Sequence, residues 1–287
     1  MNENTTPKWL NRDEYPFDSN WFELPMGKMH YVDEGEGDSL VFVHGNPGWS
    51  YEFRKVIKAV SRTMRCIACD HIGFGLSDKP FEWNYLPSSH ADNFEKLMLH
   101  LGLDNIILVV NDWGGPIGLS FALKYPEKIK HIIITNTWMW SAENDPYYRK
   151  FSSFMGGPIG RFLIRNFNFF GKVVIKKCYA DKKNFDSGIY AHLNTRNDRK
   201  GCWTFPGQII GSSRWLEQLW NDKEKLESVP KTLIWGLKDI AFREKEFETW
   251  RKSMVFQRII PLLTSGHYPH EEDSNVIIEE IVRCSEE

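Results

Sequence analysis

Hydrophobic and polar positions along the chain alternate between short apolar runs and longer amphipathic stretches. The apolar runs are typical of strands buried on both faces of a parallel sheet, and they occupy residues 40–43, 65–69, 106–110, 132–135 and 232–235. Between them, apolar residues recur at helical spacing, as in Phe94, Leu97, Met98 and Leu101. This alternation predicts an α/β fold with a doubly wound, mostly parallel sheet.

Two further segments resemble strands at the borders of this sheet. Residues 28–33 alternate polar and apolar side chains, which predicts an edge strand. Residues 257–261 predict the last strand, and the closing segment carries Ile277, Ile278 and Ile281 at helical spacing.

The pattern changes between residues 138 and 213. No clear strand appears there, aromatic residues are frequent, and the segment is too long for a plain connection. We interpret residues 138–213 as a helical cap inserted between two strands, and residues 1–137 and 214–287 as the core domain. Most of the aromatic residues are expected to pack within the cap, while a few line an apolar pocket.

Composition excludes several classes of function. The 287 residues carry a net charge of −2 without a basic stripe, which argues against nucleic-acid binding. No apolar run reaches membrane-spanning length, so no membrane insertion is expected. Residues 1–12 are polar and lack a signal-peptide core, which predicts a cytoplasmic protein. The five cysteines at 66, 69, 178, 202 and 284 form neither a disulfide framework nor a zinc motif, so buried free thiols are expected.

The apolar run at residues 106–110 ends abruptly at Asn111 and Asp112, and glycines at 114, 115 and 118 lead into an expected helix over residues 116–125. A strand, a tight turn and a helix with a reactive side chain at the apex form a nucleophile elbow. Here the apex residue is Asp112, whose carboxylate can displace a leaving group from carbon and form an ester. A strand-end aspartate that caps the next helix is the competing interpretation.

Two more polar residues follow predicted strands, and they complete a catalytic constellation. The order Asp112, Asp239, His267 is the order nucleophile, acid, histidine of an α/β-hydrolase. His267 would take a proton from water, and Asp239 would orient the imidazole and stabilise its charged form. Taken singly, Asp239 could be a turn residue and His267 a loop histidine; His270 is the next candidate for the base.

Several motifs together resemble the haloalkane dehalogenases of the α/β-hydrolase superfamily. They are His44-Gly45-Asn46-Pro47, residues 70–78, residues 110–115, residues 235–239 and Gly266-His267. The resemblance implies an eight-stranded sheet with a cap, a nucleophile at Asp112, and no metal or organic cofactor. It also implies that Asn46 and Trp113 bind the departing halide ion, since their N–H groups supply donors without adding a base. Otherwise Trp113 would pack under the cap and Asn46 would be a turn residue.

The expected position of the catalytic acid indicates which dehalogenase subfamily the chain resembles. Some dehalogenases carry a glutamate after the strand that precedes the cap, but residues 135–138 read Thr-Asn-Thr-Trp and the first carboxylate is Glu143. The acid is therefore expected at Asp239, which together with Asn46 resembles the third dehalogenase subfamily. That subfamily is similar to the β-lactone decarboxylases of long-chain olefin biosynthesis, so β-lactone decarboxylation is a second possible activity.

Two further enzyme classes share this fold but need different residues around the nucleophile. Epoxide hydrolases also use an elbow aspartate and need paired lid tyrosines, for which the candidates are Tyr147, Tyr148, Tyr179 and Tyr190. Fluoroacetate dehalogenases need an arginine soon after the nucleophile, where this chain has Trp113-Gly114. A binding module without turnover would not require an intact triad. The expected reaction is therefore displacement of halide from a small apolar haloalkane and hydrolysis to an alcohol; the sequence sets neither the preferred substrate nor the oligomeric state.

Overall fold

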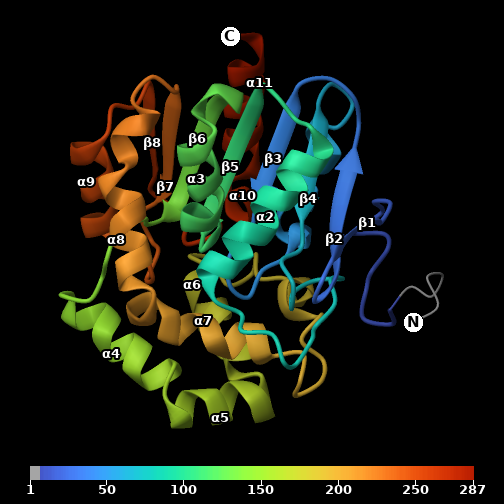
Figure 1. The fold of residues 1–287 in the computed structure, drawn as a ribbon, viewed down its shortest axis with the longest axis vertical. Helices are drawn as coiled ribbons and strands as arrows, with labels where there is room; N and C mark the ends of the chain where they lie inside the picture. Colours follow the sequence, from blue (N-terminus) through green and yellow to red (C-terminus); the bar gives the residue numbers. More distant parts are fainter. Residues whose placement is uncertain (1–6) are drawn as a thin grey trace.

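The computed structural model describes residues 7–287, so the first half of the polar N-terminal segment lies outside the described residues. An eight-stranded sheet forms the centre of the molecule, in the order β1-β2-β4-β3-β5-β6-β7-β8 (Figure 1). From β4 to β8 all neighbours are parallel, as predicted, whereas β2 pairs antiparallel with both β1 and β4. The strands are Asn20–Leu24, Gly27–Glu34, Ser39–Val43, Arg65–Cys69, Ile106–Asp112, Ile129–Thr137, Lys231–Gly236 and Arg258–Leu262.

One strand was predicted at the correct residues but at the wrong place in the sheet. The segment predicted as the edge is β2, which pairs on both sides, and the true edge is β1 at Asn20–Leu24. β1 is short and its side chains are mostly half-buried or exposed, so it has no apolar run that the sequence would reveal. In β2, Met29, His30 and Val32 are buried while the other residues remain partly exposed, and Met29 and Val32 belong to the cores on opposite faces of the sheet.

Helices cover both faces of the sheet, and the parallel strands supply side chains to both layers. In β5, Leu108 and Val110 pack with α2, α3, α8 and α9, whereas Ile107 and Val109 pack with α1 and α11 on the other face. This explains the continuous apolar runs in the sequence. These helices span Arg54–Val60 (α1), Pro87–Leu101 (α2), Gly114–Lys124 (α3), Ser213–Asn221 (α8), Glu244–Ser253 (α9) and Ser274–Glu286 (α11).

The chain between β6 and α8 folds into helices that lie across one end of the sheet (Figure 1). They are Pro146–Met155 (α4), Pro158–Phe167 (α5), Ile175–Cys178 (α6) and Lys200–Gly211 (α7), with a π-helical turn at Phe170–Val174. Their apolar residues form a small core of their own, which includes Met155, Ile164 and Ile189. A short helix, Pro269–Glu272 (α10), follows β8.

The cysteines and the lengths of the helices complete the description of the fold. All five cysteines are free and buried, as expected. Among residues 7–287, no helix is both long and apolar enough to cross a membrane.

Candidate active site

Asp112 lies at a tight turn between β5 and α3, and its backbone is left-handed with φ of 51°. Such a turn needs neighbours without side chains. A Cβ atom at Gly45 would lie 2.2 Å from Asp112 Oδ1, and one at Gly114 would lie 1.9 Å from the carbonyl oxygen of Val43. The glycines therefore allow the loop after β3 to approach the apex closely, which is the elbow geometry predicted from the sequence.

Backbone groups hold the carboxylate of Asp112 in place. The N–H of Asn46 donates to Oδ1 at 2.7 Å, and the N–H of Trp113 also bonds the carboxylate. Burial raises the pKa of Asp112, while the nearby imidazole of His267 and the two N–H donors act in the opposite direction. The N–H of Asn46 thus holds Oδ1, and Oδ2 remains on the side of His267.

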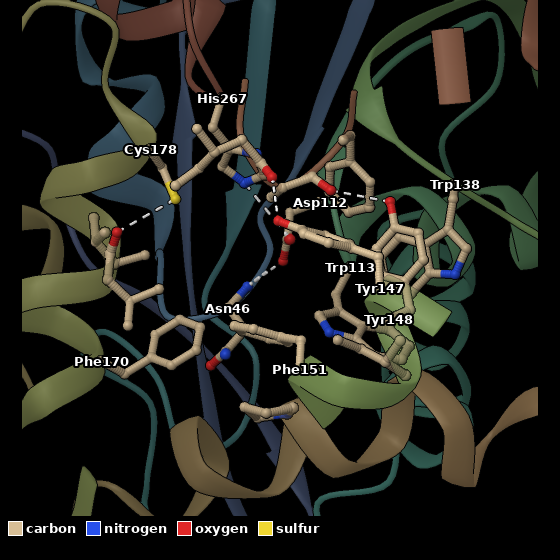
Figure 2. A pocket seen from close by; sticks show the side chains of 17 residues that line it. Asn46, Asp112, Trp113, Trp138, Tyr147, Tyr148, Phe151, Phe170, Cys178 and His267 are labelled. Carbon is tan, nitrogen blue, oxygen red and sulfur yellow. Dashed lines mark hydrogen bonds and ion pairs between the residues drawn. The ribbon is translucent and has the colours of Figure 1, made fainter. Parts of the chain in front are cut away.

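His267 connects the two aspartates, and Figure 2 shows it beside Asp112. Its Nε2 lies 3.6 Å from Asp112 Oδ2, and its Nδ1 lies 2.8 Å from Asp239 Oδ2. Burial lowers the pKa of the imidazole, but the carboxylates of Asp239 and Asp112 outweigh it and leave the pKa raised above 6.5. The three side chains therefore lie as nucleophile, base and acid require.

The carboxylate of Asp239 is held by groups that the sequence did not single out. Asn136 donates from Nδ2 to Asp239 Oδ2 at 3.0 Å and exchanges two further hydrogen bonds with the backbone of Gly236. The N–H of Ala241 donates to Asp239 Oδ1 at 2.7 Å. Asn136 lies on β6, in the stretch without a carboxylate noted in the sequence, and its side chain binds Asp239 instead.

A second asparagine holds the backbone of the histidine. Asn111 Nδ2 donates to the carbonyl oxygen of His267 at 3.1 Å and to Thr135 Oγ1 at 3.2 Å. Asn111 is fully buried and precedes the apex residue on β5. Its polar side chain at the end of an apolar run was the only sequence signal for this role.

Other candidate residues lie away from this centre. Glu143 is exposed in the turn before α4, so it is not a partner of His267. His270 is buried with Nε2 3.6 Å from Glu52 Oε1, and neither side chain lines the pocket described below. Burial raises the pKa of Glu52, as do Asp112 and Glu271 nearby, and this buried carboxyl was not anticipated.

The triad opens into a pocket with a mainly apolar lining (Figure 2). Its walls come from α4, the π-helical turn, α6, α7 and the loop after Asp239. The aromatic residues of the cap region that reach it are Trp138, Tyr147, Tyr148, Phe151 and Phe170. The sequence predicted such residues without being able to choose them, because their orientation depends on how the cap helices pack.

Asn46 and Trp113 both line the pocket around Asp112 (Figure 2). The Trp113 ring packs edge-on against Trp138 with 4.5 Å between centroids, and it contacts Phe205 at 5.1 Å. Asn46 is buried, and its Oδ1 has no hydrogen-bond partner among the described residues. The buried carboxamide of Asn46 and the indole of Trp113 line the pocket with Asp112, so their polar groups are available to a ligand.

The candidate lid tyrosines are engaged with the backbone or with other rings. The hydroxyl of Tyr147 donates to the carbonyl of Ile240 at 2.6 Å, and that of Tyr148 donates to the carbonyl of Ala241 at 3.0 Å. Tyr179 stacks on Tyr268, and Tyr190 stacks on Phe185. The Tyr179 hydroxyl has no hydrogen-bond partner among the described residues, but neither Tyr179 nor Tyr190 lines the pocket. The pocket therefore does not receive a pair of free tyrosine hydroxyls.

Within residues 7–287, one group of side chains has the composition of a metal site: His131, Glu280 and Cys284. It lies outside the pocket. Glu280 pairs with Arg258 at 2.6 Å and with Arg283 at 2.7 Å, and these cations already neutralise its carboxylate. The charge balance at this group disfavours a bound cation.

Comparison with known proteins identifies the relatives of the chain. The family model of the alpha/beta hydrolase fold matches residues 38–274. The chain is 34% identical to "Haloalkane dehalogenase 2" of Mycobacterium tuberculosis (strain ATCC 25618 / H37Rv) over 275 residues, covering 93% of this chain and 95% of that protein. It is 33% identical to "Cis-3-alkyl-4-alkyloxetan-2-one decarboxylase" of Shewanella oneidensis over 278 residues, covering 93% and 87%.

Solved structures agree on the fold. The haloalkane dehalogenase DbeA from Bradyrhizobium elkani superposes with a TM-score of 0.82 at 21% identity, covering 93% of this chain and 98% of DbeA. The haloalkane dehalogenase DatA from Agrobacterium tumefaciens superposes with a TM-score of 0.79 at 20% identity, covering 93% and 97%.

Proposed function

The chain belongs to the haloalkane dehalogenase family of the α/β hydrolases, and we propose that it hydrolyses an apolar haloalkane through an ester formed on Asp112. The observation that carries the proposal is the carboxylate at the elbow apex, which the N–H groups of Asn46 and Trp113 hold and whose Oδ2 lies beside His267. A carboxylate in this position is suited to attack on a carbon that bears a leaving group. We also propose that residues 138–213 act as the cap of a core formed by residues 1–137 and 214–287.

In the first step, Asp112 Oδ2 attacks the carbon that bears the halogen. A C–O bond forms, the carbon–halogen bond breaks, and the halide leaves with the electron pair. The indole N–H of Trp113 and the carboxamide of Asn46 would stabilise the charge that develops on the halide. The apolar walls exclude water at this stage, which strengthens these interactions.

In the second step, His267 Nε2 takes a proton from water, and the resulting hydroxide attacks the carboxyl carbon of the ester. The oxyanion then develops on Oδ1, where the N–H groups of Asn46 and Trp113 would receive it. Asp239 stabilises the imidazolium through Nδ1 until the proton passes to the departing alcohol. Asp112 is left as a carboxylic acid and then loses its proton, so the net reaction converts haloalkane and water into alcohol, halide and a proton.

A second candidate is supported by a different observation. The decarboxylase of Shewanella oneidensis is nearly as similar as the dehalogenase, and the acid at Asp239 and the apolar pocket fit a β-lactone equally well. In that reaction the leaving carboxylate stays tethered to the substrate, and loss of carbon dioxide yields an alkene. Epoxide hydrolysis is less favoured, because the hydroxyls of Tyr147 and Tyr148 bind backbone carbonyls.

A side-by-side turnover assay tests the proposal. Bromoalkanes of several chain lengths and a cis-β-lactone would be offered to the wild type and to Asp112→Ala, with bromide, alcohol and alkene measured. Enzyme-dependent bromide release that Asp112→Ala abolishes is the expected result. Alkene from the lactone without any bromide release would replace the dehalogenase proposal with the decarboxylase.

A further inference from the structure

The first part of the cap has a charge composition unlike the rest of the chain. Residues 146–180 contain seven lysines or arginines and no aspartate or glutamate, and subtracting these seven charges from the net −2 leaves −9 on all other residues. All seven basic side chains are exposed; they are Arg149, Lys150, Arg161, Arg165, Lys172, Lys176 and Lys177. Positive charge is therefore concentrated on one end of an otherwise acidic protein.

Large apolar side chains project into solvent from the same segment. Phe154, near the end of α4, is 51% exposed, and on α5 Ile159 and Phe162 are 65% and 58% exposed. Phe167 closes α5 at 59% exposure, and its ring centroid lies 6.0 Å from that of Phe162. Clustered apolar side chains at this exposure are typical of a surface that a partner covers.

The two helices α4 and α5 form the outer end of the cap, farthest from the sheet (Figure 1). In α5, Gly160 and Ile164 are buried, whereas Ile159 and Phe162 are three positions apart and share an outward face. Arg161 projects into solvent from the same helix. A helix with exposed apolar side chains beside arginines has the pattern of a segment that lies in the interfacial region of a bilayer.

We propose that the outer surface of α4 and α5 binds the surface of a bilayer that contains anionic lipids. This lipid-binding patch consists of Phe154, Ile159, Phe162 and Phe167 with Arg161 and Arg165. The apolar side chains enter the boundary between headgroups and acyl chains, and the basic side chains interact with lipid phosphates. The positive charge of residues 146–180 favours this partner, because an anionic lipid surface attracts these residues while the acidic remainder of the protein faces water.

The inner side of the same segment lines the active-site pocket through Phe151, Phe170 and Cys178 (Figure 2). An apolar substrate that dissolves in the bilayer would then meet the enzyme beside its pocket. This advantage for catalysis rests on the proposed function, whereas lipid binding by the patch is independent of it.

Sedimentation of the full chain with lipid vesicles tests the proposal. The protein is expected to bind vesicles of equal parts phosphatidylcholine and phosphatidylglycerol, to bind phosphatidylcholine alone much less, and to dissociate as salt rises. Each basic residue near an anionic surface contributes about fivefold in partitioning, so the double variant Arg161→Gln with Arg165→Gln should bind about 25-fold more weakly. Ile159→Ser with Phe162→Ser should lose binding by a comparable factor.

Matched controls come from the opposite end of the strands. Val255, which is 79% exposed before β8, and Arg62, which is exposed before β4, supply Val255→Ser and Arg62→Gln. Both should bind vesicles like the wild type, and circular dichroism should show all variants folded. The proposal is overturned if mixed vesicles bind no protein, or if the patch variants and the controls bind equally. It is also overturned if gel filtration shows a dimer that only the patch variants abolish, since a second copy would then cover the patch.

Discussion

Replacing Asp239 with asparagine removes a carboxylate whose oxygens are both engaged. Oδ2 accepts from His267 Nδ1 at 2.8 Å and from Asn136 Nδ2 at 3.0 Å, and Oδ1 accepts from the N–H of Ala241 at 2.7 Å. Asparagine offers one acceptor oxygen and one NH₂ group. In either orientation, the new NH₂ group faces a donor that Asp239 now satisfies.

The size of the effect follows from the tautomer of His267. If the NH₂ group faces the imidazole, Nδ1 must accept and the ring proton moves to Nε2, the atom that must receive a proton from water. Losing the base and the charge that stabilises the imidazolium costs about 10⁴-fold in the hydrolytic step. Displacement of halide by Asp112 requires no proton transfer, so that first step should slow by less than about tenfold.

Rapid-quench measurement of bromide release separates the two steps. Asp239→Asn should release a burst of bromide equal to the enzyme concentration and then nearly stop, while intact-protein mass spectrometry shows the alkyl adduct. Glu143→Gln is the matched control, because Glu143 is exposed before α4 and should not affect turnover. Steady turnover of Asp239→Asn within about tenfold of the wild type would refute this reasoning, as would an equal loss in Glu143→Gln.

Three further predictions test other parts of the molecule. His267→Gln should still form the ester but not hydrolyse it, so mass spectrometry should find the adduct on Asp112; full activity without an adduct would move the base, with His270 as the next candidate. Trp113→Phe should slow bromide release by about tenfold to a thousandfold, and Asn46→Ala by the same or less, in single-turnover assays. Burial lowers the pKa of several histidines well below 6.5, so they stay neutral in the folded protein while the unfolded chain binds protons below that pH. Stability should therefore be highest above about pH 6.5 and fall as the pH drops below it, as thermal melting would show; a melting temperature independent of pH between about 5 and 7 would contradict this. The histidines concerned are His71, His90, His192 and His270.

Strands buried on both faces were predictable because burial leaves a continuous apolar run. The prediction for residues 65–69 coincides with β4, and the run at 106–110 lies within β5 at Ile106–Asp112. The edge at Asn20–Leu24 was missed for the opposite reason, since only one residue of β1 is buried. Sequence pattern therefore locates the centre of this sheet better than its border.

Chain order and strand ends were enough to bring Asp112, Asp239 and His267 together as candidates, because parallel strands place their carboxyl ends at one edge. The support of the acid by Asn136 was not predictable, since it depends on a contact across 103 positions. The aromatic residues that line the pocket were also not predictable. Neighbouring side chains of one cap helix point either into the pocket or into solvent, and the sequence does not say which. The local sequence pattern therefore predicts the reactive side chains, whereas the residues that support them depend on tertiary packing.

The hydrogen bond from Asn111 to the carbonyl of His267 joins residues 156 positions apart. Contacts between such distant residues form slowly during folding, because closing a long loop costs entropy before the contact contributes any stability. Helices such as α2 and α3 depend on local contacts and can form earlier. In a refolding experiment, the helical circular-dichroism signal should therefore recover before catalytic turnover. Turnover should return only when the strands from β5 to β8 have paired.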